Sequence, residues 1–465
     1  MLDNEIGGEE KKLSVSEALN IGINFQRNGN LSKASEVYRE ILKCFPEQSD
    51  AHHLLGLICS QLGDWDEAIK EIKKAIELNP NAIFYGNLGM VYQGLNNFFE
   101  AFINFEKALE LNPVYDGAYL AHYNLGIYYT EKKNFERAIF HYDKCLELNN
   151  SFYDAYWNRG LILLVLGKYK DGFEDYEYRF KKKSSTDSRD FRKPKWNGED
   201  LNGKRILVSC EQGFGDSIQF VRYIPLIKER GGDVILECKK ELKRLFENFN
   251  GLIDGIVDKQ KDKVPEIDFD YYIHLMSLPR IFDTTTENVP FSNGYIHINK
   301  TSKREFDKSK FNIGIVWSGN PDFPDNSLKS ANFEDFKILT EIPGIKFYSL
   351  QKGKAGERLN DSEIEDLTKE IFDFRDTAEF VAGLDLIISI DTSIAHLAGA
   401  MRKDVWVLLN DSADWRFGIN GNNCVWYSSM RLFRQKEKGD WKSVFEEVKR
   451  ELERVIKERD IFNNK

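Results

Sequence analysis

The sequence predicts two kinds of fold in one chain: an all-α solenoid of helical repeats, followed by an α/β part made of two doubly wound lobes. Two observations lead to this prediction. Small residues recur with a period near 34 through the first part of the chain, and short apolar strands alternate with helices through the rest. With 465 residues, of which 42% are hydrophobic and 30% charged, the chain is long enough for two or three folded domains.

The repeats are marked by small residues at fixed positions. Glycines follow one another at intervals of 34, 33, 37 and 34 residues, at Gly22, Gly56, Gly89, Gly126 and Gly160. Each is followed twelve positions later by another small residue, at Ala34, Ala68, Ala101, Ala138 and Gly172. This pattern resembles the tetratricopeptide repeat, in which two antiparallel helices touch at small residues. The resemblance implies about five repeats and a groove that binds a protein or peptide.

The polar stretch Lys181–Asp190 interrupts the helical period and is the predicted boundary. After it, strands are expected at 205–209, 233–237, 312–317, 346–350, 386–390 and 405–409, and helices at 216–230, 240–249, 332–342, 377–384 and 394–400. This alternation predicts a parallel sheet with helices on both faces in each lobe, and a ligand at the carboxyl ends of the strands. The expected parts are a polar tail (1–14), the repeats (15–186), a first lobe (187–300) and a second lobe with a closing C-terminal helix (301–465).

The first lobe opens with a glycine-containing turn, Cys210-Glu-Gln-Gly-Phe-Gly-Asp216. Gly213 and Gly215 let the backbone turn tightly and approach a ligand. Asp216 then stands at a helix start, either as an N-cap or as a carboxylate that faces the other lobe, and its pairing with two glycines favours the functional interpretation. The turn is not a dinucleotide fingerprint, because Gln219 stands where a third glycine would be needed.

The second lobe contains a hydroxyl-rich turn between an apolar strand and a helix of small residues, Asp391-Thr-Ser-Ile-Ala-His396. The first amides of such a helix and its dipole suit a phosphate, Thr392 and Ser393 add hydroxyls, and His396 adds a switchable donor. The alternative is an ordinary N-cap with a buried core histidine. Two other strand-end loops and one nearby lysine favour a phosphate site, with the candidate contacts Ser318, Gly319, Asn320, Lys329, Gln351 and Lys352.

From about Lys193 onward the chain resembles bacterial glycosyltransferases similar to ADP-heptose heptosyltransferases, family 9 of the GT-B fold. The resemblance is carried by Glu211–Tyr223, Val316–Pro321, Ser349–Gly353, Asp385–Ala400 and Met430–Gln435. It implies that Asp216 is the general base and that the Asp391–His396 turn holds the donor diphosphate. Candidates for an acceptor or sugar pocket are Gln212, Gln219, Trp415 and Arg416.

Two positions depart from the family pattern. The pair Trp415-Arg416 is followed by a short polar segment, Gly418–Gly421, and Lys329 stands where relatives carry arginine. Lysine keeps the charge but loses the bidentate geometry of a guanidinium.

The resemblance implies metal-independent, inverting transfer of a sugar from a nucleotide-sugar donor to an acceptor hydroxyl. Repeats joined to a transferase resemble the layout of the eukaryotic protein O-GlcNAc transferase and of bacterial flagellin glycosyltransferases, which implies a protein acceptor held by the repeats. Two alternatives stay open. One is a heptosyltransferase-like enzyme that acts on lipopolysaccharide or another glycan, and the other is a non-catalytic repeat scaffold with a degenerate transferase domain.

Composition excludes several other classes. A net charge of −10 argues against a nucleic-acid partner. The six cysteines lack zinc-type spacing, and no Asp-x-Asp pair stands at a strand end of the second lobe, so neither a metal nor a cofactor is expected. The polar N-terminus and the lack of a long apolar run predict a cytoplasmic protein without a transmembrane segment.

Overall fold

The computed structural model describes residues 13–182, 187, 189–247, 249, 251–298, 304–322, 326–356 and 364–463. Most of the expected tail, and the expected boundaries at 186 and 300, lie outside these residues. The chain divides into two compact units, Met1–Arg159 and Gly160–Lys465, which we call the repeat unit and the sheet unit. The division lies within α9 (Tyr153–Val165), upstream of the polar stretch in which the sequence predicts a boundary.

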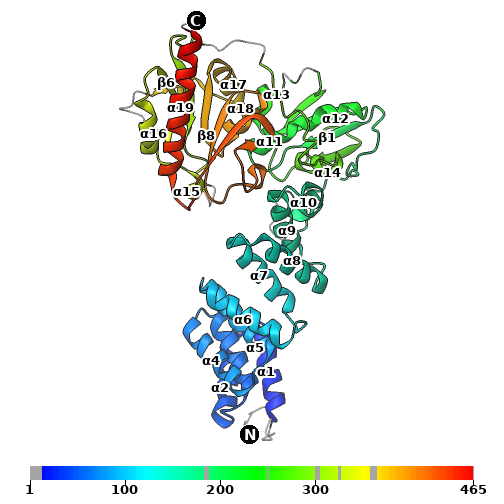
Figure 1. Ribbon diagram of the computed structural model, residues 1–465. Coiled ribbons are helices and arrows are strands. Elements are labelled where there is room, and N and C mark those ends of the chain that lie inside the picture. Colours follow the sequence, from blue (N-terminus) through cyan, green and yellow to red (C-terminus); the bar gives the residue numbers. More distant parts are fainter. Residues whose placement is uncertain are drawn as a thin grey trace. The chain divides into compact units, whose positions relative to one another are not determined.

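The repeat unit is built from helical pairs (Figure 1). They are α1 (Val15–Arg27) with α2 (Leu31–Cys44), α3 (Ser49–Gln61) with α4 (Trp65–Leu78), α5 (Ala82–Gly94) with α6 (Phe98–Leu111), and α7 (Ala118–Glu131) with α8 (Phe135–Leu148). A Cβ added at Gly89 would come within 2.7 Å of the Phe105 ring, and one at Gly126 within 2.5 Å of Tyr142. The predicted role of the small residues, close contact between paired helices, is therefore confirmed.

Equivalent polar residues start the second helix of each pair. Their side-chain oxygens accept hydrogen bonds from backbone amides three residues further on, at Asn30, Asp64, Asn97 and Asn134. Such N-caps satisfy an amide that the helix itself leaves without a partner. The turn before each second helix is thus fixed by a side chain of the turn itself.

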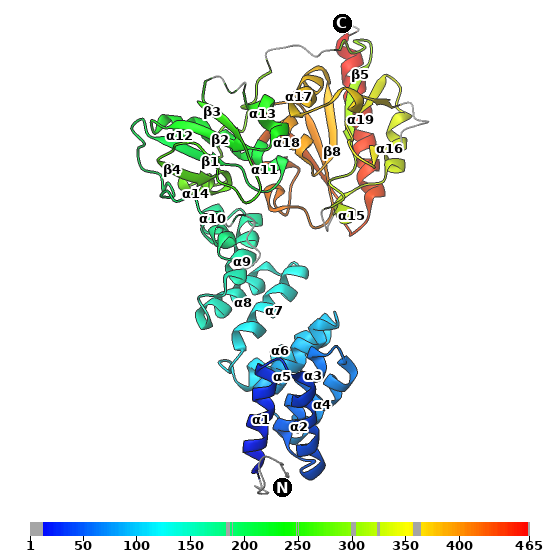
Figure 2. The same ribbon diagram turned by 180° about the vertical axis from the view of Figure 1, so that it is seen from behind.

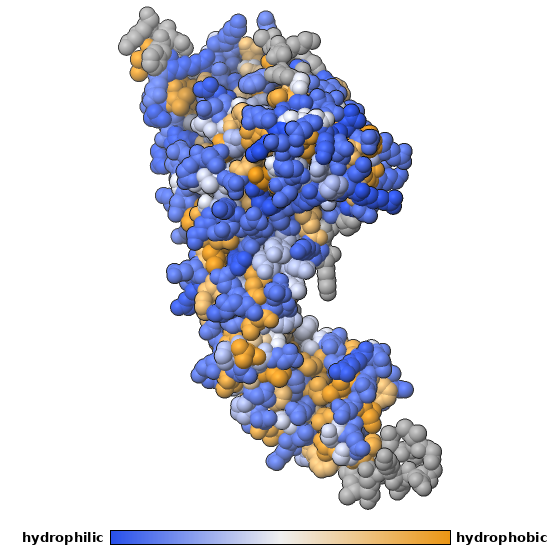
Figure 3. Space-filling view, turned by 90° about the vertical axis from the view of Figure 1, so that its right-hand side faces the viewer, coloured by the Kyte–Doolittle hydropathy of each residue, from blue (hydrophilic) through white to orange (hydrophobic). Residues whose placement is uncertain are grey.

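Some apolar side chains of the repeat helices remain exposed, and the face drawn in Figure 3 carries apolar residues among polar ones in this unit. On α5 and α6 they include Ile83, Met90, Phe98, Phe99 and Ile103, each more than 40% exposed. Exposed apolar side chains that gather on one surface are typical of interaction surfaces.

The sheet unit begins with the C-terminal part of α9, then α10 (Tyr169–Tyr176) and the 3-10 helix η1 (Glu177–Phe180). Its first sheet has the order β3-β2-β1-β4 and is parallel throughout (Figure 2). The strands are β1 (Arg205–Ser209), β2 (Asp233–Cys238), β3 (Gly255–Asp258) and β4 (Tyr271–His274). The helices are α11 (Phe214–Phe220), η2 (Val221–Tyr223), α12 (Ile224–Glu229), α13 (Lys240–Phe246), η3 (Leu275–Ser277) and α14 (Leu278–Ile281). The single helix expected at 216–230 is broken, because Pro225 has no amide proton to continue it.

The second sheet has seven strands in the order β10-β11-β9-β8-β5-β6-β7, and only the β10–β11 pair is antiparallel. The strands are β5 (Phe311–Val316), β6 (Ile345–Ser349), β7 (Glu365–Asp366), β8 (Leu386–Ile390), β9 (Val405–Leu409), β10 (Asn423–Cys424) and β11 (Tyr427–Arg434). The predicted parallel sheets with helices are therefore confirmed, whereas the antiparallel edge was not predicted.

Helices surround the second sheet. They are α15 (Asn326–Lys329), α16 (Phe333–Thr340), η5 (Thr368–Glu370), α17 (Phe374–Gly383), α18 (Ser393–Ala400), η6 (Trp415–Phe417) and α19 (Trp441–Asn463). The long α19, red in Figure 1, lies beside α16 and buries Phe445 against Phe336. It lies in the segment where the sequence predicts a closing helix.

Within the described part of the chain, no helix is long and apolar enough to cross a membrane. The same residues hold no group of three or more His, Cys, Asp and Glu side chains placed to bind a metal ion. The six cysteines are all free, and only Cys44 is exposed.

Candidate functional site

The two strand-end turns that the sequence singles out lie against each other in the sheet unit. One follows β1 and leads into α11, and the other follows β8 and leads into α18. A Cβ added at Gly215 would come within 2.9 Å of the His396 ring and 3.5 Å of Ser393 Cα. Glycine at this position is therefore what lets α11 approach the start of α18.

Asp216 makes two different contacts with its two carboxylate oxygens. Oδ2 accepts a hydrogen bond from the Gly213 amide at 2.7 Å, and Oδ1 accepts one from Arg416 Nη2 at 2.5 Å. The N-cap interpretation of Asp216 is therefore wrong, because Gly213 occupies that position and Asp216 is the third residue of α11. Its Oδ2 makes the return bond of a capping box to the Gly213 amide, and its Oδ1 is left to pair with Arg416. Burial raises the pKa of Asp216 above its ordinary value, although the charge of Arg416 opposes this shift.

Arg416 lies at the centre of the site and contacts several of its side chains. Besides Asp216, its guanidinium donates to Gln219 Oε1 at 2.7 Å and to Asp414 Oδ1 at 2.8 Å, and it lies over the Trp415 ring at 4.4 Å. Burial alone would lower the pKa of Arg416, but the carboxylates of Asp414 and Asp216 outweigh that effect and raise it. A permanent positive charge is therefore held between two carboxylates.

A second cluster lies at the start of α18. Lys329 Nζ donates to Asp391 Oδ2 at 3.0 Å, and His396 Nε2 lies 3.9 Å from Asp391 Oδ1. Burial raises the pKa of Asp391, while the charge of Lys329 opposes this. The charge of Arg416 also affects the pKa values of Asp391, Lys329 and His396, so the two clusters share one electrostatic environment.

His396 is a neutral imidazole at physiological pH. Burial, assisted by the positive charge of Arg416, lowers the pKa of His396 to about 3, and its Nδ1 lies 3.1 Å from the Tyr427 hydroxyl. The sequence predicts a donor that switches its charge near neutral pH, and the buried environment removes that switch.

Thr392 occupies the N-cap position of α18 but makes no side-chain bond to the helix amides. Its hydroxyl instead lies 2.9 Å from the Ser389 hydroxyl. Ser393, the first residue of α18, lies beside Gly215. The start of this helix is therefore not capped by the side chain that the ordinary N-cap interpretation requires.

Three other predicted donor contacts stabilise the loop that follows β5. Gln351 Oε1 accepts hydrogen bonds from the Trp317 and Ser318 amides at 3.0 and 2.8 Å. The Ser330 hydroxyl lies 3.3 Å from the Ser318 hydroxyl and accepts from the Gly319 amide at 3.4 Å. Gln351, Ser318 and Gly319 thus shape the loop in this structure.

The last two predicted donor contacts are held outside the two clusters. Asn320 is exposed and accepts from the Asp322 amide at 3.1 Å. Lys352 Nζ donates to the Ile371 carbonyl at 2.5 Å. Of the two lysines in the prediction, Lys329 is the one that the structure joins to the Asp391–His396 turn.

Sequence reasoning missed several residues of the site. Asp414 precedes the Trp415-Arg416 pair, and its acidic side chain next to an arginine was the available signal. Tyr427 lies on β11, which was not predicted, so nothing local pointed to its contact with His396. Arg222 is fully buried and donates to the Trp426 carbonyl at 2.8 Å and to the Gln219 carbonyl at 2.8 Å.

Together these groups combine three largely buried carboxylates, two of which have a raised pKa, with two cations, a neutral imidazole and the start of a helix. Carboxylates, cations and imidazoles with strongly shifted pKa values, gathered where strand-end loops meet, are typical of functional sites. The cations and the helix start suit an anion, and the carboxylate suits proton transfer.

Comparisons with known proteins identify the repeats. Residues 49–82 and 80–151 each match the tetratricopeptide repeat family. Protein FlbA of Caulobacter vibrioides is 27% identical over 314 residues, and the match covers 61% of this chain and 52% of that protein. The chain thus spans about half the length of this curated relative, and the matched share is larger than the repeat unit alone.

Solved repeat proteins match a smaller part. MamA is 24% identical to this chain, and the match covers 36% of this chain and 94% of the MamA chain, with a TM-score of 0.31. PilW, a widely conserved type IV pilus biogenesis factor, is 23% identical over 37% of this chain and 80% of its own, with a TM-score of 0.32. YrrB, a repeat protein with an unusual peptide-binding site, is 18% identical over 36% of this chain and 84% of its own, with a TM-score of 0.30.

Proposed function

We propose that the sheet unit is a glycosyltransferase of the GT-B fold that moves a sugar from a nucleotide-sugar donor to an acceptor hydroxyl. The observation that carries the proposal is the Asp216–Arg416 pair, which lies next to the Asp391–His396 turn. A group suited to remove a proton and groups suited to hold a diphosphate are thereby brought together from segments far apart in the sequence.

The donor diphosphate binds at the start of α18 in this proposal. The helix amides, Lys329 and Arg416 offset the charge that grows on the diphosphate as the bond to the sugar breaks. Neutral His396 supplies a hydrogen bond without requiring a change of protonation.

Asp216 acts as the base. The diphosphate competes with Asp216 for the Arg416 guanidinium and thereby frees Oδ1 of the carboxylate. The acceptor hydroxyl then transfers its proton to Asp216 while its oxygen bonds to the anomeric carbon, and the diphosphate leaves with the electron pair of the broken bond. The raised pKa of Asp216 favours this proton transfer.

The repeats indicate a protein-interaction scaffold. We therefore propose a protein acceptor that the repeats capture, since capture raises the effective concentration of a weak acceptor hydroxyl at the transferase. The exposed apolar side chains of α5 and α6 support a role in contact with another protein.

Isothermal titration of the full chain with a panel of nucleotides and nucleotide sugars tests the donor site. Lys329→Met and Lys352→Met form a matched pair, because both lysines are predicted donor contacts but only Lys329 reaches the Asp391–His396 turn. We expect Lys329→Met to weaken nucleotide binding about tenfold or more, since a cation is worth more in a buried site than at the surface. We expect Lys352→Met to change it less than threefold. Equal losses in both variants would refute the placement of the diphosphate.

Asp216→Asn tests the base. The amide oxygen still accepts from Gly213, so the turn is kept, but the side chain no longer takes up a proton. Transfer should fall about 10²-fold to 10⁴-fold while donor affinity stays within a few fold. Unchanged turnover would remove Asp216 from the mechanism. Mass spectrometry of candidate acceptor proteins and glycans, co-expressed with the wild-type chain or with Asp216→Asn, then identifies the acceptor.

A scaffold without catalysis is the second candidate, and the tetratricopeptide match favours it directly. The two candidates differ in a simple way. A pure scaffold binds no nucleotide in the titration, whereas a transferase binds at least one.

A further inference from the structure

We infer that α10 and η1, which the sequence assigns to the last repeat, position the loop from which Asp216 is presented. Tyr176 and Arg179 are the positioning residues, and the loop consists of Glu211, Gln212 and Gly213. The functional meaning of this inference rests on the proposed transferase activity, whereas its structural content does not.

Arg179 forms a buried ion pair with Glu211, the first residue of the loop. Its Nε and Nη2 donate to Glu211 Oε2 and Oε1 at 2.9 and 2.6 Å, and the two side chains are 4% and 1% exposed. Nη2 also donates to the Ser277 hydroxyl at 3.0 Å, next to β4. Such a bidentate pair fixes the orientation of Glu211 as well as its distance from η1.

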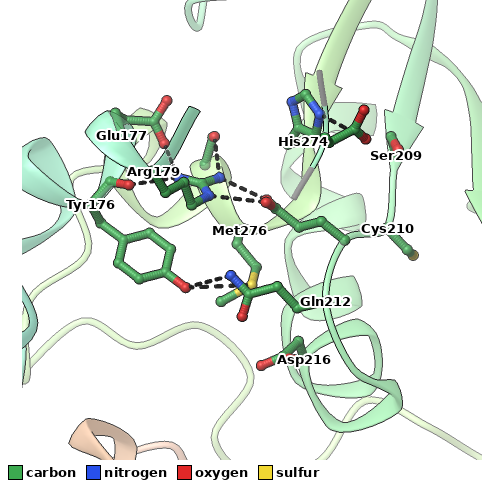
Figure 4. A network of polar contacts seen from close by, with 12 residues as sticks. Tyr176, Glu177, Arg179, Ser209, Cys210, Gln212, Asp216, His274 and Met276 are labelled. Atoms are coloured by element: carbon green, nitrogen blue, oxygen red, sulfur yellow. Dashed lines mark hydrogen bonds and ion pairs between the residues drawn. The ribbon is translucent and has the colours of Figure 1, made fainter. Parts of the chain in front are cut away.

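Tyr176 holds the second residue of the loop. Gln212 Nε2 donates to the Tyr176 hydroxyl at 2.9 Å (Figure 4). Gln212 has a φ of 60°, a left-handed conformation that a residue with a side chain seldom adopts and that needs support from its surroundings. Lys239 gives the other support, by donating to the Gln212 carbonyl at 3.0 Å.

The held loop leads directly to the proposed base. Gly213 follows Gln212, and its amide donates to Asp216 Oδ2 at 2.7 Å. A bonded path therefore runs from α10 through Gln212 and Gly213 to the Asp216 carboxylate. Any change in the φ of Gln212 moves the amide that orients this carboxylate.

The same helix also packs on the segment that carries Arg416. The Phe173 ring meets Trp415 edge-on at 5.6 Å, and the Tyr169 ring stacks on Trp426 at 5.5 Å, with the Trp426 Nε1 donating to the Tyr169 hydroxyl at 3.0 Å. Trp415 directly precedes Arg416. Thus α10 contacts both segments that form the Asp216–Arg416 pair, which is the arrangement of a positioning element.

Tyr176→Phe in the full chain tests the inference, with Tyr169→Phe as its matched control. Both tyrosines are buried on α10, and each substitution removes one hydroxyl that accepts a hydrogen bond from a side chain. Tyr176→Phe also removes the weak bond that the Tyr176 hydroxyl donates to the Met276 sulfur at 3.9 Å. Only Tyr176→Phe loses the bond to the loop. The first readout is amide hydrogen exchange of peptides that cover 211–217 and 390–396.

We expect Tyr176→Phe to speed exchange at 211–217 about fivefold to tenfold, as the loss of one hydrogen bond implies, and to leave 390–396 unchanged. Tyr169→Phe should leave 211–217 at the wild-type rate. The inference is overturned if exchange at 211–217 is unchanged in Tyr176→Phe, or if it rises equally in both variants.

The second readout separates positioning from general stability. With a donor that the wild type uses, Tyr176→Phe should lower kcat about tenfold and keep the donor dissociation constant within twofold, because the donor side of the site is untouched. Adding Gln212→Met should have little further effect on exchange at 211–217, since both changes remove the same bond. If the two substitutions had additive effects on exchange at 211–217, Tyr176 and Gln212 would not act through one shared hydrogen bond, and the inference would be overturned. If the wild-type chain uses no donor, the proposed function fails, and hydrogen exchange alone decides whether α10 positions the loop.

Discussion

The ion pairs along single helices of the repeat unit differ from the ion pairs of the candidate site in the sheet unit. In the repeat unit, exposed ion pairs join residues three apart on one helix, such as Lys74–Glu77 at 3.2 Å and Lys107–Glu110 at 2.9 Å. In the sheet unit, the Arg416–Asp216 and Arg179–Glu211 pairs are largely buried and join segments far apart in the sequence. Exposed pairs contribute little to stability, whereas breaking a buried pair leaves a charge without compensation. The repeats are thus specified by shape, and the candidate site by charge.

The largest effect is expected when the central cation of the site is removed. Arg416→Met leaves the Asp216 and Asp414 carboxylates, whose side chains are 18% and 26% exposed, without their partner. The sheet unit should therefore lose about 3 kcal/mol of unfolding free energy, the lower end for a buried pair. Urea unfolding followed by tryptophan fluorescence measures this loss. Arg454→Met, which breaks exposed pairs with Glu451 and Glu458 on α19, is the control and should shift the urea midpoint far less than Arg416→Met. Similar losses in the two variants would mean that the contrast between buried and exposed pairs does not hold here.

The repeat unit should respond instead to a change of volume. Gly126→Ala places a Cβ within 2.5 Å of the Tyr142 ring and should destabilise the unit by about 1–3 kcal/mol. The sign of the change in stability is informative, because helix propensity alone would make Gly126→Ala stabilising by about 1 kcal/mol. Hydrogen exchange of α7 and α8 measures the change. Tyr142→Leu in the same chain should relieve part of the clash, and a stabilised Gly126→Ala variant would contradict the role of close packing.

Acid should weaken the repeat unit through buried histidines. Burial lowers the pKa values of His53, His122 and His141 to about 4, from an ordinary value of 6.5. The native state therefore keeps these residues neutral while the unfolded state binds protons below pH 6.5. Stability should be complete above about pH 6.5 and fall as the pH drops toward 4, by up to about 1.4 kcal/mol per pH unit for each proton.

Hydrogen exchange of α7 and α8 at pH 7.5 and at pH 5, corrected for intrinsic rates, measures this acid effect. His122 Nδ1 lies 3.0 Å from His141 Nδ1, so His122→Asn should reduce the pH dependence. Greater protection at pH 5 than at pH 7.5 would reverse the expected sign.

The smallest effect is expected at the surface of the repeats. Lys74→Ala removes an exposed pair with Glu77, whose side chain is 68% exposed, and should change the unfolding free energy by less than about 0.5 kcal/mol. A loss as large as that in Gly126→Ala would show that charge, and not shape alone, specifies this unit.

The candidate site could be predicted from the sequence only in part. Asp216 and the Asp391–His396 turn were found because each stands where an apolar strand ends and a helix begins, which is a local pattern. Each turn lies at the carboxyl end of a strand in a different sheet, and the close approach of the two was seen only in the structure. The contact of Asp216 with Arg416, 200 positions further along the chain, has no local signature. The neutral state of His396 also escaped prediction, because its cause is burial among groups from other segments.

The sequence by itself determined the repeat period and the strands β1, β8 and β9, whose observed bounds are those expected. Each of these depends on a pattern along the chain. Small residues at a fixed spacing mark the contacts between paired helices, and an apolar run between polar residues marks a strand. Only the tertiary structure showed that α10 contacts the loop before Asp216 and that β10 and β11 form the edge of the second sheet. The shifted pKa values of the site also came from the tertiary structure alone. These depend on burial and on partners far away in the sequence, which composition and spacing do not encode.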